Sequence, residues 1–261
     1  LRTALYFSDA IVSVLVAVVT RSPSALIWGL IVGSLVEVYF SHRYIAPRPI
    51  FAFDFKKLKE VIGQGKWMTL SGIFNYLFQE GDDILVGRLL QTNQLGLYQM
   101  AYRISTLPIT EVADVFGKVS FPVYTKISED KERLYKAFRK TILATALVVF
   151  PMGAILFVFP QLIVSLLLGE NWLSIVPTIK ILSIFGIVRA ISGSSSALFL
   201  SVKKQRYVAG FTFVSVMGMA LLIIPLIVRY GMVGAAMAVT AGSVLAVPFV
   251  IYWVTQVFKE K

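Results

Sequence analysis

The chain has 261 residues, of which 57% are hydrophobic and only 15% charged, and its mean hydropathy is +0.78. Soluble domains carry about 25% charged residues, so this composition indicates a polytopic membrane protein, and the formal charge of +11 indicates basic loops that orient the chain in a bilayer rather than nucleic-acid binding. The absence of cysteine excludes disulfides and thiolate metal sites, and a single histidine, His42, argues against a histidine-rich metal site or a Ser-His-Asp triad.

Apolar runs long enough to cross a membrane follow one another along the chain. They predict an all-α, polytopic transmembrane helix bundle of about eight spans. The predicted spans are 4–20, 24–41, 62–90, 95–122, 137–159, 173–200, 206–228 and 231–257. The chain starts at Leu1 without a charged region or a cleavage site of small residues, so we expect no signal peptide and interpret the sequence as part of a longer protein.

Residues 46–61 are expected to form a cytoplasmic amphipathic linker between the second and third spans. Ala46-Pro47-Arg48-Pro49 cannot be helical, and the basic amphipathic stretch at 53–59 suits the membrane surface. A second amphipathic lead-in at 128–133 precedes the fifth span. Residues 62–261, which follow this linker, are expected to form a C-terminal six-helix bundle.

Lysine and arginine are concentrated in alternate loops. The second-to-third, fourth-to-fifth and sixth-to-seventh connections and the C-terminus are basic, whereas the intervening loops are nearly free of lysine and arginine. Because basic loops stay on the cytoplasmic side, this alternation predicts that both ends of the chain are cytoplasmic. It also supports the number of spans, since one miscounted span would disturb the pattern.

The third predicted span carries three carboxylates at membrane depth, where each costs roughly 2.5–3.5 kcal/mol. Glu80 and Asp83 share a helix face, and Asp82 is rotated from Asp83 by about 100°. Crowded carboxylates in a low-dielectric cavity can exchange protons or hold a sodium ion, so we consider all three as ion-coupling candidates. The alternative is purely structural ion pairing with Arg103.

The fourth predicted span has a polar stripe in which Arg103, Thr110, Asp114 and Lys118 share one face. Pro108 lies within this stripe and can kink the helix as a hinge. Arg103 is a candidate for substrate binding in a cavity. Asp114 and Lys118 are interpreted as structural, because an i,i+4 pair can simply neutralise itself.

The sixth predicted span places Arg189, Ser192 and Ser196 in a second polar stripe. A guanidinium beside hydroxyl groups suits a phosphate or sugar ligand, which makes these three residues candidates for substrate binding in a cavity. Hydroxyl groups that bond back to the helix, with Arg189 paired to an acid, are the alternative.

Several short motifs occur in a characteristic order. They are Gly65-Lys66-Trp67, Asp82 with Gly87-Arg88-Leu89-Leu90, Leu95-Gly96-Leu97-Tyr98, Ala101-Tyr102-Arg103, Phe121-Pro122 and Leu167-Leu168-Gly169-Glu170-Asn171-Trp172. In this order and spacing the chain resembles the second half of polysaccharide flippases of the MATE-related MOP superfamily, the Wzx-type exporters of O-antigen and exopolysaccharide. Residues 1–45 resemble the last two helices of the first half of that family. The family's first four helices are absent from this sequence.

The resemblance implies two bundles around a cavity that opens to alternate faces of a bacterial or archaeal cytoplasmic membrane. It implies transfer of an undecaprenyl-pyrophosphate-linked oligosaccharide to the outer leaflet, coupled to H⁺ or Na⁺, without a cofactor, resident metal or enzymatic step. A polysaccharide polymerase and chain-length machinery are the implied partners. Asp82 matches the family's acid in its helix, and Arg103 matches the Tyr-Arg element.

Two other functions remain as alternatives. A multidrug or cation exporter of the same superfamily would need an acidic, aromatic cavity with few arginines, so Arg103 and Arg189 count against it. A membrane glycosyltransferase or polymerase would need an acidic metal motif or a large catalytic loop, and the predicted loops are short.

Overall fold

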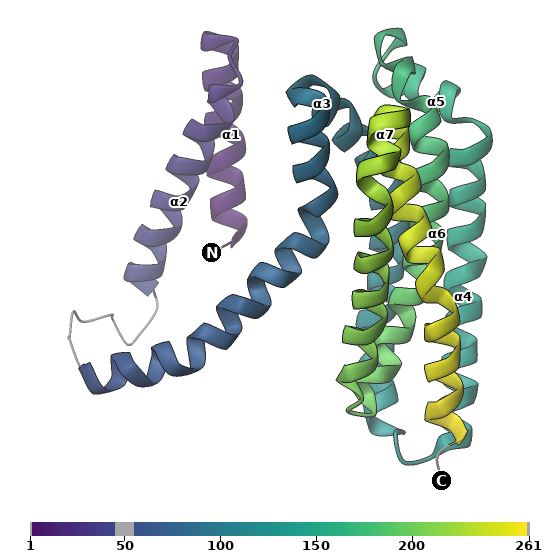
Figure 1. The fold of residues 1–261 in the computed structure, drawn as a ribbon. Helices are drawn as coiled ribbons and strands as arrows, with labels where there is room; N and C mark the ends of the chain where they lie inside the picture. The colour runs from purple at the N-terminus through teal and green to yellow at the C-terminus, as the bar shows by residue number, and fades with distance from the viewer. Residues whose placement is uncertain (1, 45–54, 260–261) are drawn as a thin grey trace. The chain divides into compact units, whose positions relative to one another are not determined.

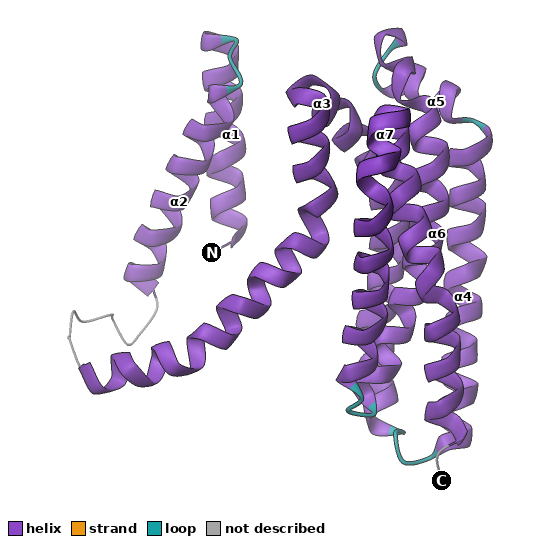
Figure 2. Ribbon diagram, in the orientation of Figure 1, coloured by secondary structure: helices purple, strands orange, loops and turns teal. Residues whose placement is uncertain are grey.

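The computed structural model describes residues 2–44 and 55–259, with the side chains of all of these except residues 2–5, 56–75 and 77–79. Its described part is helical, with connecting turns and no strand (Figure 2). The bounds are α1 Arg2–Thr20, α2 Ser24–Tyr44, α3 Phe55–Lys126, α4 Lys131–Val158, α5 Pro160–Leu167, η1 Glu170–Ile175, α6 Val176–Ser201 and α7 Gln205–Lys259 (Figure 1). The all-α prediction is confirmed.

The chain divides into two compact units, residues 1–68 and 69–261. In the first unit α1 and α2 form a hairpin whose turn places Arg21 at φ 48°. Gly29 allows close packing there, because a Cβ at this position would lie 2.8 Å from the Asp9 carbonyl oxygen. The predicted linker at 46–61 falls largely on residues 45–54, which lie outside the described residues, and it stays a prediction.

The second unit contains two long helical hairpins, each interrupted at a single residue. In α3 the non-helical residue is Gln91, with φ 72° and ψ 167°, and in α7 it is Gly231, with φ 60° and ψ −138°. Each break falls where the sequence predicted one span to end and the next to begin. α3 and α7 therefore supply two predicted spans apiece.

Four described helical segments are long and apolar enough to cross a membrane: Ser24–Tyr44, Lys131–Val158, Glu170–Ser201 and Gln205–Lys259. The last has 55 residues and can cross twice, because it reverses at Gly231. The protein is thus a multi-pass membrane protein. The connection between α4 and α6 was not predicted in detail: a short helix, α5, and the 3₁₀ turn η1 occupy it.

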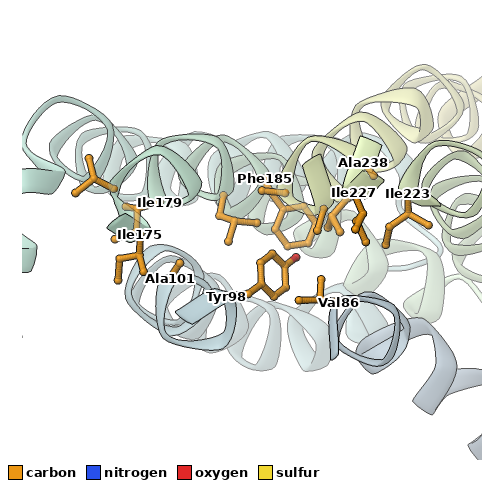
Figure 3. Close-up of a cluster of buried hydrophobic side chains, with 14 of the residues drawn as sticks. Val86, Tyr98, Ala101, Ile175, Ile179, Phe185, Ile223, Ile227 and Ala238 are labelled. Atoms are coloured by element: carbon orange, nitrogen blue, oxygen red, sulfur yellow. The ribbon is translucent and has the colours of Figure 1, made fainter. Parts of the chain in front are cut away.

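The core of the second unit is built mainly from α3, α6 and α7. Val86, Tyr98, Phe185, Ile223 and Ala238 are buried together, and Figure 3 shows the Tyr98 ring between apolar side chains of the neighbouring helices. A second cluster around Tyr124, Leu134 and Phe199 closes the end of the unit near the C-terminus. These apolar contacts hold the polar residues of α3 and α6 at fixed positions inside the bundle.

Candidate functional site

The hairpin of α3 brings two of the predicted acids against the limb that follows Gln91. The Tyr98 hydroxyl donates a hydrogen bond to Asp82 Oδ2 at 2.8 Å, and Gln99 Nε2 donates to Asp83 Oδ2 at 2.8 Å. Tyr98 is fully buried and Asp82 is only 5% exposed. The carboxylate of Asp82 is therefore held inside the protein by one specific donor.

A cavity of about 370 Å³, called here the acidic cavity, opens beside these residues. It is lined by Glu80, Asp82, Asp83, Gln99, Tyr102, Arg103 and Leu107. All three predicted ion-coupling acids and Arg103 thus meet at one void. Arg103 is exposed, and it forms no ion pair within 4.0 Å with these acids, because the ion pairs found among the described residues are Asp130–Arg133 and Glu132–Lys136. Among the described residues, Glu80, Asp82, Asp83 and Arg103 therefore do not form a closed ion-pair cluster.

A second void of about 660 Å³, the mixed-charge cavity, lies between the second limb of α3 and α6. Its charged lining consists of Glu111, Asp114, Lys118 and Arg189. Asp114 and Lys118 do not form an ion pair within 4.0 Å, so their charges are not neutralised by direct contact as one interpretation of their spacing expected. Two acids and two cations thus line one polar space.

The structure divides the predicted stripe on α6. Arg189 and Ser196 line the mixed-charge cavity, whereas Ser192 lines an apolar groove on another side of the helix. The expectation that all three act together is corrected: at about 100° per residue Ser192 is offset from Arg189 by about 60°, enough to turn it past the edge of the cavity.

Arg189 connects the two cavities through Tyr102. Arg189 Nη1 donates a hydrogen bond to the Tyr102 hydroxyl at 2.8 Å, and its guanidinium lies 5.7 Å from the centre of the Phe185 ring. Tyr102 also lines the acidic cavity, and a void of about 30 Å³ beside it is bounded by Asp82, Arg189 and Ser215 among others. That volume suits about one water molecule. Asp82 and Arg189 thus border the same small void, together with Tyr102.

Three residues of this network were not predicted as site residues: Tyr98, Gln99 and Tyr102. Their signal lies in the pairing of the hairpin. Asp82 with Tyr98 and Asp83 with Gln99 meet across the break at Gln91, and Asp83 and Gln99 each lie eight residues from that break. Counting outward from the predicted loop at 91–94 places Tyr102 opposite Asp83 and Arg103 opposite Asp82, so it would have brought Tyr102 into the site but not the observed partners Tyr98 and Gln99.

Pro108 lies within α3, whose backbone has non-helical angles only at Gln91 among its described residues. The predicted kink is therefore not a break in helical geometry. Proline still removes one backbone donor, so the carbonyl of Ile104 lacks its usual partner. Among the described residues, no three His, Cys, Asp or Glu side chains converge as they would in a metal site.

A family model described as "Polysaccharide biosynthesis protein" matches residues 2–177, about two thirds of the chain. The chain belongs to this polysaccharide biosynthesis protein family. The resemblance predicted from the motifs is confirmed.

Individual curated proteins are also similar to the chain. The chain is 29% identical over 223 residues to the lipopolysaccharide biosynthesis protein WzxC of Escherichia coli K12, covering 84% of this chain and 44% of that protein. It is 28% identical over 201 residues to the teichuronic acid biosynthesis protein TuaB of Bacillus subtilis 168, covering 77% of this chain and 40% of that protein. The chain thus spans less than half the length of these two curated relatives.

A solved structure of the lipid II flippase MurJ, in an inward closed conformation, has the same fold. The TM-score is 0.80 at 15% sequence identity, and the match covers 96% of this chain and 56% of the other. At this identity the similarity establishes the architecture of this family member and not its substrate. The predicted flippase-like bundle is confirmed as a fold.

Proposed function

We propose that the protein to which this chain corresponds is a flippase that moves a lipid-linked oligosaccharide across the cytoplasmic membrane by alternating access. The observation that carries the proposal is the mixed-charge cavity, a void of about 660 Å³ in the membrane-spanning bundle, lined by Lys118 and Arg189. Charged groups at membrane depth are costly and are retained where they face a pathway. The names of the relatives, which refer to lipopolysaccharide and teichuronic acid biosynthesis, support a glycan substrate.

The two cavities suit different partners. The mixed-charge cavity offers Arg189, whose planar guanidinium can grip a pyrophosphate, with Lys118 as a second cation and Ser196 as a hydroxyl. The acidic cavity holds three carboxylates against one guanidinium, so it suits an exchangeable proton or a sodium ion. Arg103 lines the acidic cavity and not the mixed-charge cavity, so it would bind the pyrophosphate at a different stage of the cycle from Arg189.

The Arg189–Tyr102 hydrogen bond gives a physical route for coupling. A pyrophosphate that takes the Arg189 guanidinium would compete with the Tyr102 hydroxyl, which borders the same small void as Asp82. Conversely, protonation or ion binding at Asp82 would change the electrostatic environment of the Tyr102 hydroxyl and so its hydrogen bond with Arg189. Pro108, in the limb that lines both cavities, would provide the flexible point. Asp114 would balance the charge of Lys118 when no pyrophosphate is bound. No covalent bond is made or broken in this cycle.

The surroundings follow from the same proposal. Both ends of the chain would be cytoplasmic, as the distribution of basic loops predicts. A polysaccharide polymerase and its chain-length machinery would receive the product at the outer face. The exporter of organic cations remains the second candidate, because the acidic cavity could accept a cation.

Replacing Arg189 by alanine in the intact protein tests the proposal. Surface glycan should fall at least tenfold, the loss expected when a charged ligand loses its bidentate partner. Arg88→Ala is the matched control, because Arg88 is an exposed arginine of α3 that lines neither cavity. Normal export by the Arg189 variant at normal protein levels would remove this residue from the pathway, and tight binding of hydrophobic cations would favour the second candidate.

A further inference from the structure

A groove of about 640 Å³ follows the bundle where α4, α6 and the second limb of α7 meet. Its walls are almost entirely apolar, with Phe138, Ile142, Ile187 and Val250 among them. No acidic residue lines it. It was not among the features expected from the sequence.

The groove runs along the helix axes, because its lining residues advance in register on all three elements. On α4 they extend from Tyr135 to Phe150, and on the antiparallel α6 from Ser195 back to Ile184. Helix rise gives it a length of roughly 16–22 Å along α4 and α6, and of about 12 Å along α7, where Val247 to Thr255 line it. This is the shape of a slot for an extended hydrocarbon chain.

The groove and the mixed-charge cavity lie on different sides of α6. Val188, Ile191 and Ser195 face the groove, whereas Arg189 and Gly193 line the cavity. By helical geometry the centres of these two sets are separated by more than about 100° around the helix. The groove and the mixed-charge cavity are therefore separate binding sites.

Arg139 is a cation that lines the groove, four residues from Tyr135 at its end. It is exposed and has no carboxylate within 4.0 Å among the described residues. Lys140 follows directly, and then no charged residue occurs between Thr141 and Val158, so Arg139 marks the boundary of the apolar part of α4. A guanidinium at that boundary is at the level of lipid headgroups, where basic sites between helices bind anionic lipids.

We propose that the groove is a specific site for one anionic phospholipid of the surrounding bilayer. The phosphate pairs with Arg139, and one acyl chain lies in the slot between α4, α6 and α7. Charge complementarity selects an anionic headgroup, since no acid in the groove balances the guanidinium. The site is independent of the proposed transport pathway.

Native mass spectrometry of the intact protein in detergent tests this proposal by titration with dioleoyl phosphatidylglycerol or dioleoyl phosphatidylcholine. One phosphatidylglycerol should bind at saturation, with at least tenfold preference over phosphatidylcholine. Arg139→Gln should abolish that preference, whereas Lys140→Gln, which changes a neighbouring cation outside the groove, should retain it. Val188→Phe, which fills the slot with an apolar ring, should weaken both lipids.

Three results would overturn the proposal: equal losses in the Arg139 and Lys140 variants, equal binding of the two lipids by the native protein, or unaltered binding in the Val188 variant. Displacement of bound phosphatidylglycerol by polyprenyl phosphate at equal concentration would instead identify the groove as a substrate site. Because binding and not export is measured, failure here leaves the proposed transport function untouched.

Discussion

The two long hairpins of the second unit each reverse at a single non-helical residue, but the contacts between their two limbs differ. In α7 the limbs are in backbone contact: a Cβ on Gly242 would lie 2.7 Å from the Met219 nitrogen, and one on Gly234 would overlap the Leu226 carbonyl oxygen. In α3 the limbs are joined instead by side-chain hydrogen bonds from Tyr98 and Gln99 to two carboxylates, beside an open cavity.

This difference suggests a structural role for α7 and a role in transport for α3. Small residues allow close helix packing in a bilayer, where no hydrophobic effect drives helices together, so α7 is suited to act as the rigid element. The polar interior of α3 would be costly in the bilayer core, and a pathway between the helices would account for it. Substitutions that separate the limbs of α7 should therefore lower stability, whereas substitutions of the α3 carboxylates should mainly reduce export.

The largest effect is expected from Gly234→Ala in α7. The added methyl group would meet the Leu226 backbone, which cannot rotate away as a side chain can, so the limbs must separate. We expect a loss of about 3 kcal/mol of stability. Thermal unfolding of the detergent-solubilised protein measures it.

Gly96→Ala in α3 is the matched control, because a Cβ there has nothing within 4 Å. This change should be neutral or stabilise by up to about 1 kcal/mol, since glycine is the weaker helix former. Similar destabilisation by both substitutions would contradict the distinction between a closed and an open hairpin.

A smaller but more specific effect is expected at Asp82. Asp82→Ala leaves the buried Tyr98 hydroxyl without its acceptor and should cost about 1–3 kcal/mol. Asp82→Asn keeps an acceptor oxygen and should change stability little, while glycan export is lost because the exchangeable charge is gone. Unfolding temperature and export are measured for both variants.

Unfolding temperature and export are also measured for Asp83→Asn. Asp83 is less buried and accepts its hydrogen bond from Gln99 rather than from a buried tyrosine, so this substitution should have a smaller effect than Asp82→Asn. Wild-type export by the Asp82→Asn protein would show that the buried carboxylate is structural. The contacts between the limbs of α3 would then serve helix packing alone, as those of α7 do.

The smallest effect concerns the two turns. Gln91 adopts φ 72° and ψ 167°, a conformation that only glycine adopts without strain, whereas the corresponding residue of α7 is Gly231. Gln91→Gly should stabilise the protein by about 1 kcal/mol, or roughly 2–4 °C. Gly231→Ala should lower the unfolding temperature, and a fall for both would show that Gln91 makes contacts worth more than its strain.

The sequence allowed the helices to be predicted closely, because long apolar runs and their polar interruptions are strong signals. The break at Gln91 falls between two predicted spans, and the break at Gly231 falls on the first residue of the last one. The helix α5 was missed because Pro160 opens a new helix directly after Phe159, within what looks like one apolar run.

The candidate site could be predicted less completely. Charged residues stand out in an apolar helix, so Glu80, Asp82, Asp83 and Arg103 were singled out, and they line one cavity. Uncharged partners such as Tyr98 and Tyr102 do not stand out and are identified only by helix pairing. Periodicity assigned Ser192 to the Arg189 face, but the edge of the cavity depends on how α3 and α4 pack around α6.

Water access to the mixed-charge cavity tests the central claim most directly. This chain has no cysteine, so a single cysteine can be placed at Gly193, where a Cβ has open space in the cavity lining, or at Leu143, an exposed residue of α4 that lines none of the cavities. In a cysteine-free background of the intact protein in membranes, a charged, water-soluble thiosulfonate should modify the cysteine at 193 at least tenfold faster than the one at 143. Equal, slow modification of both would contradict a water-filled pathway through this bundle.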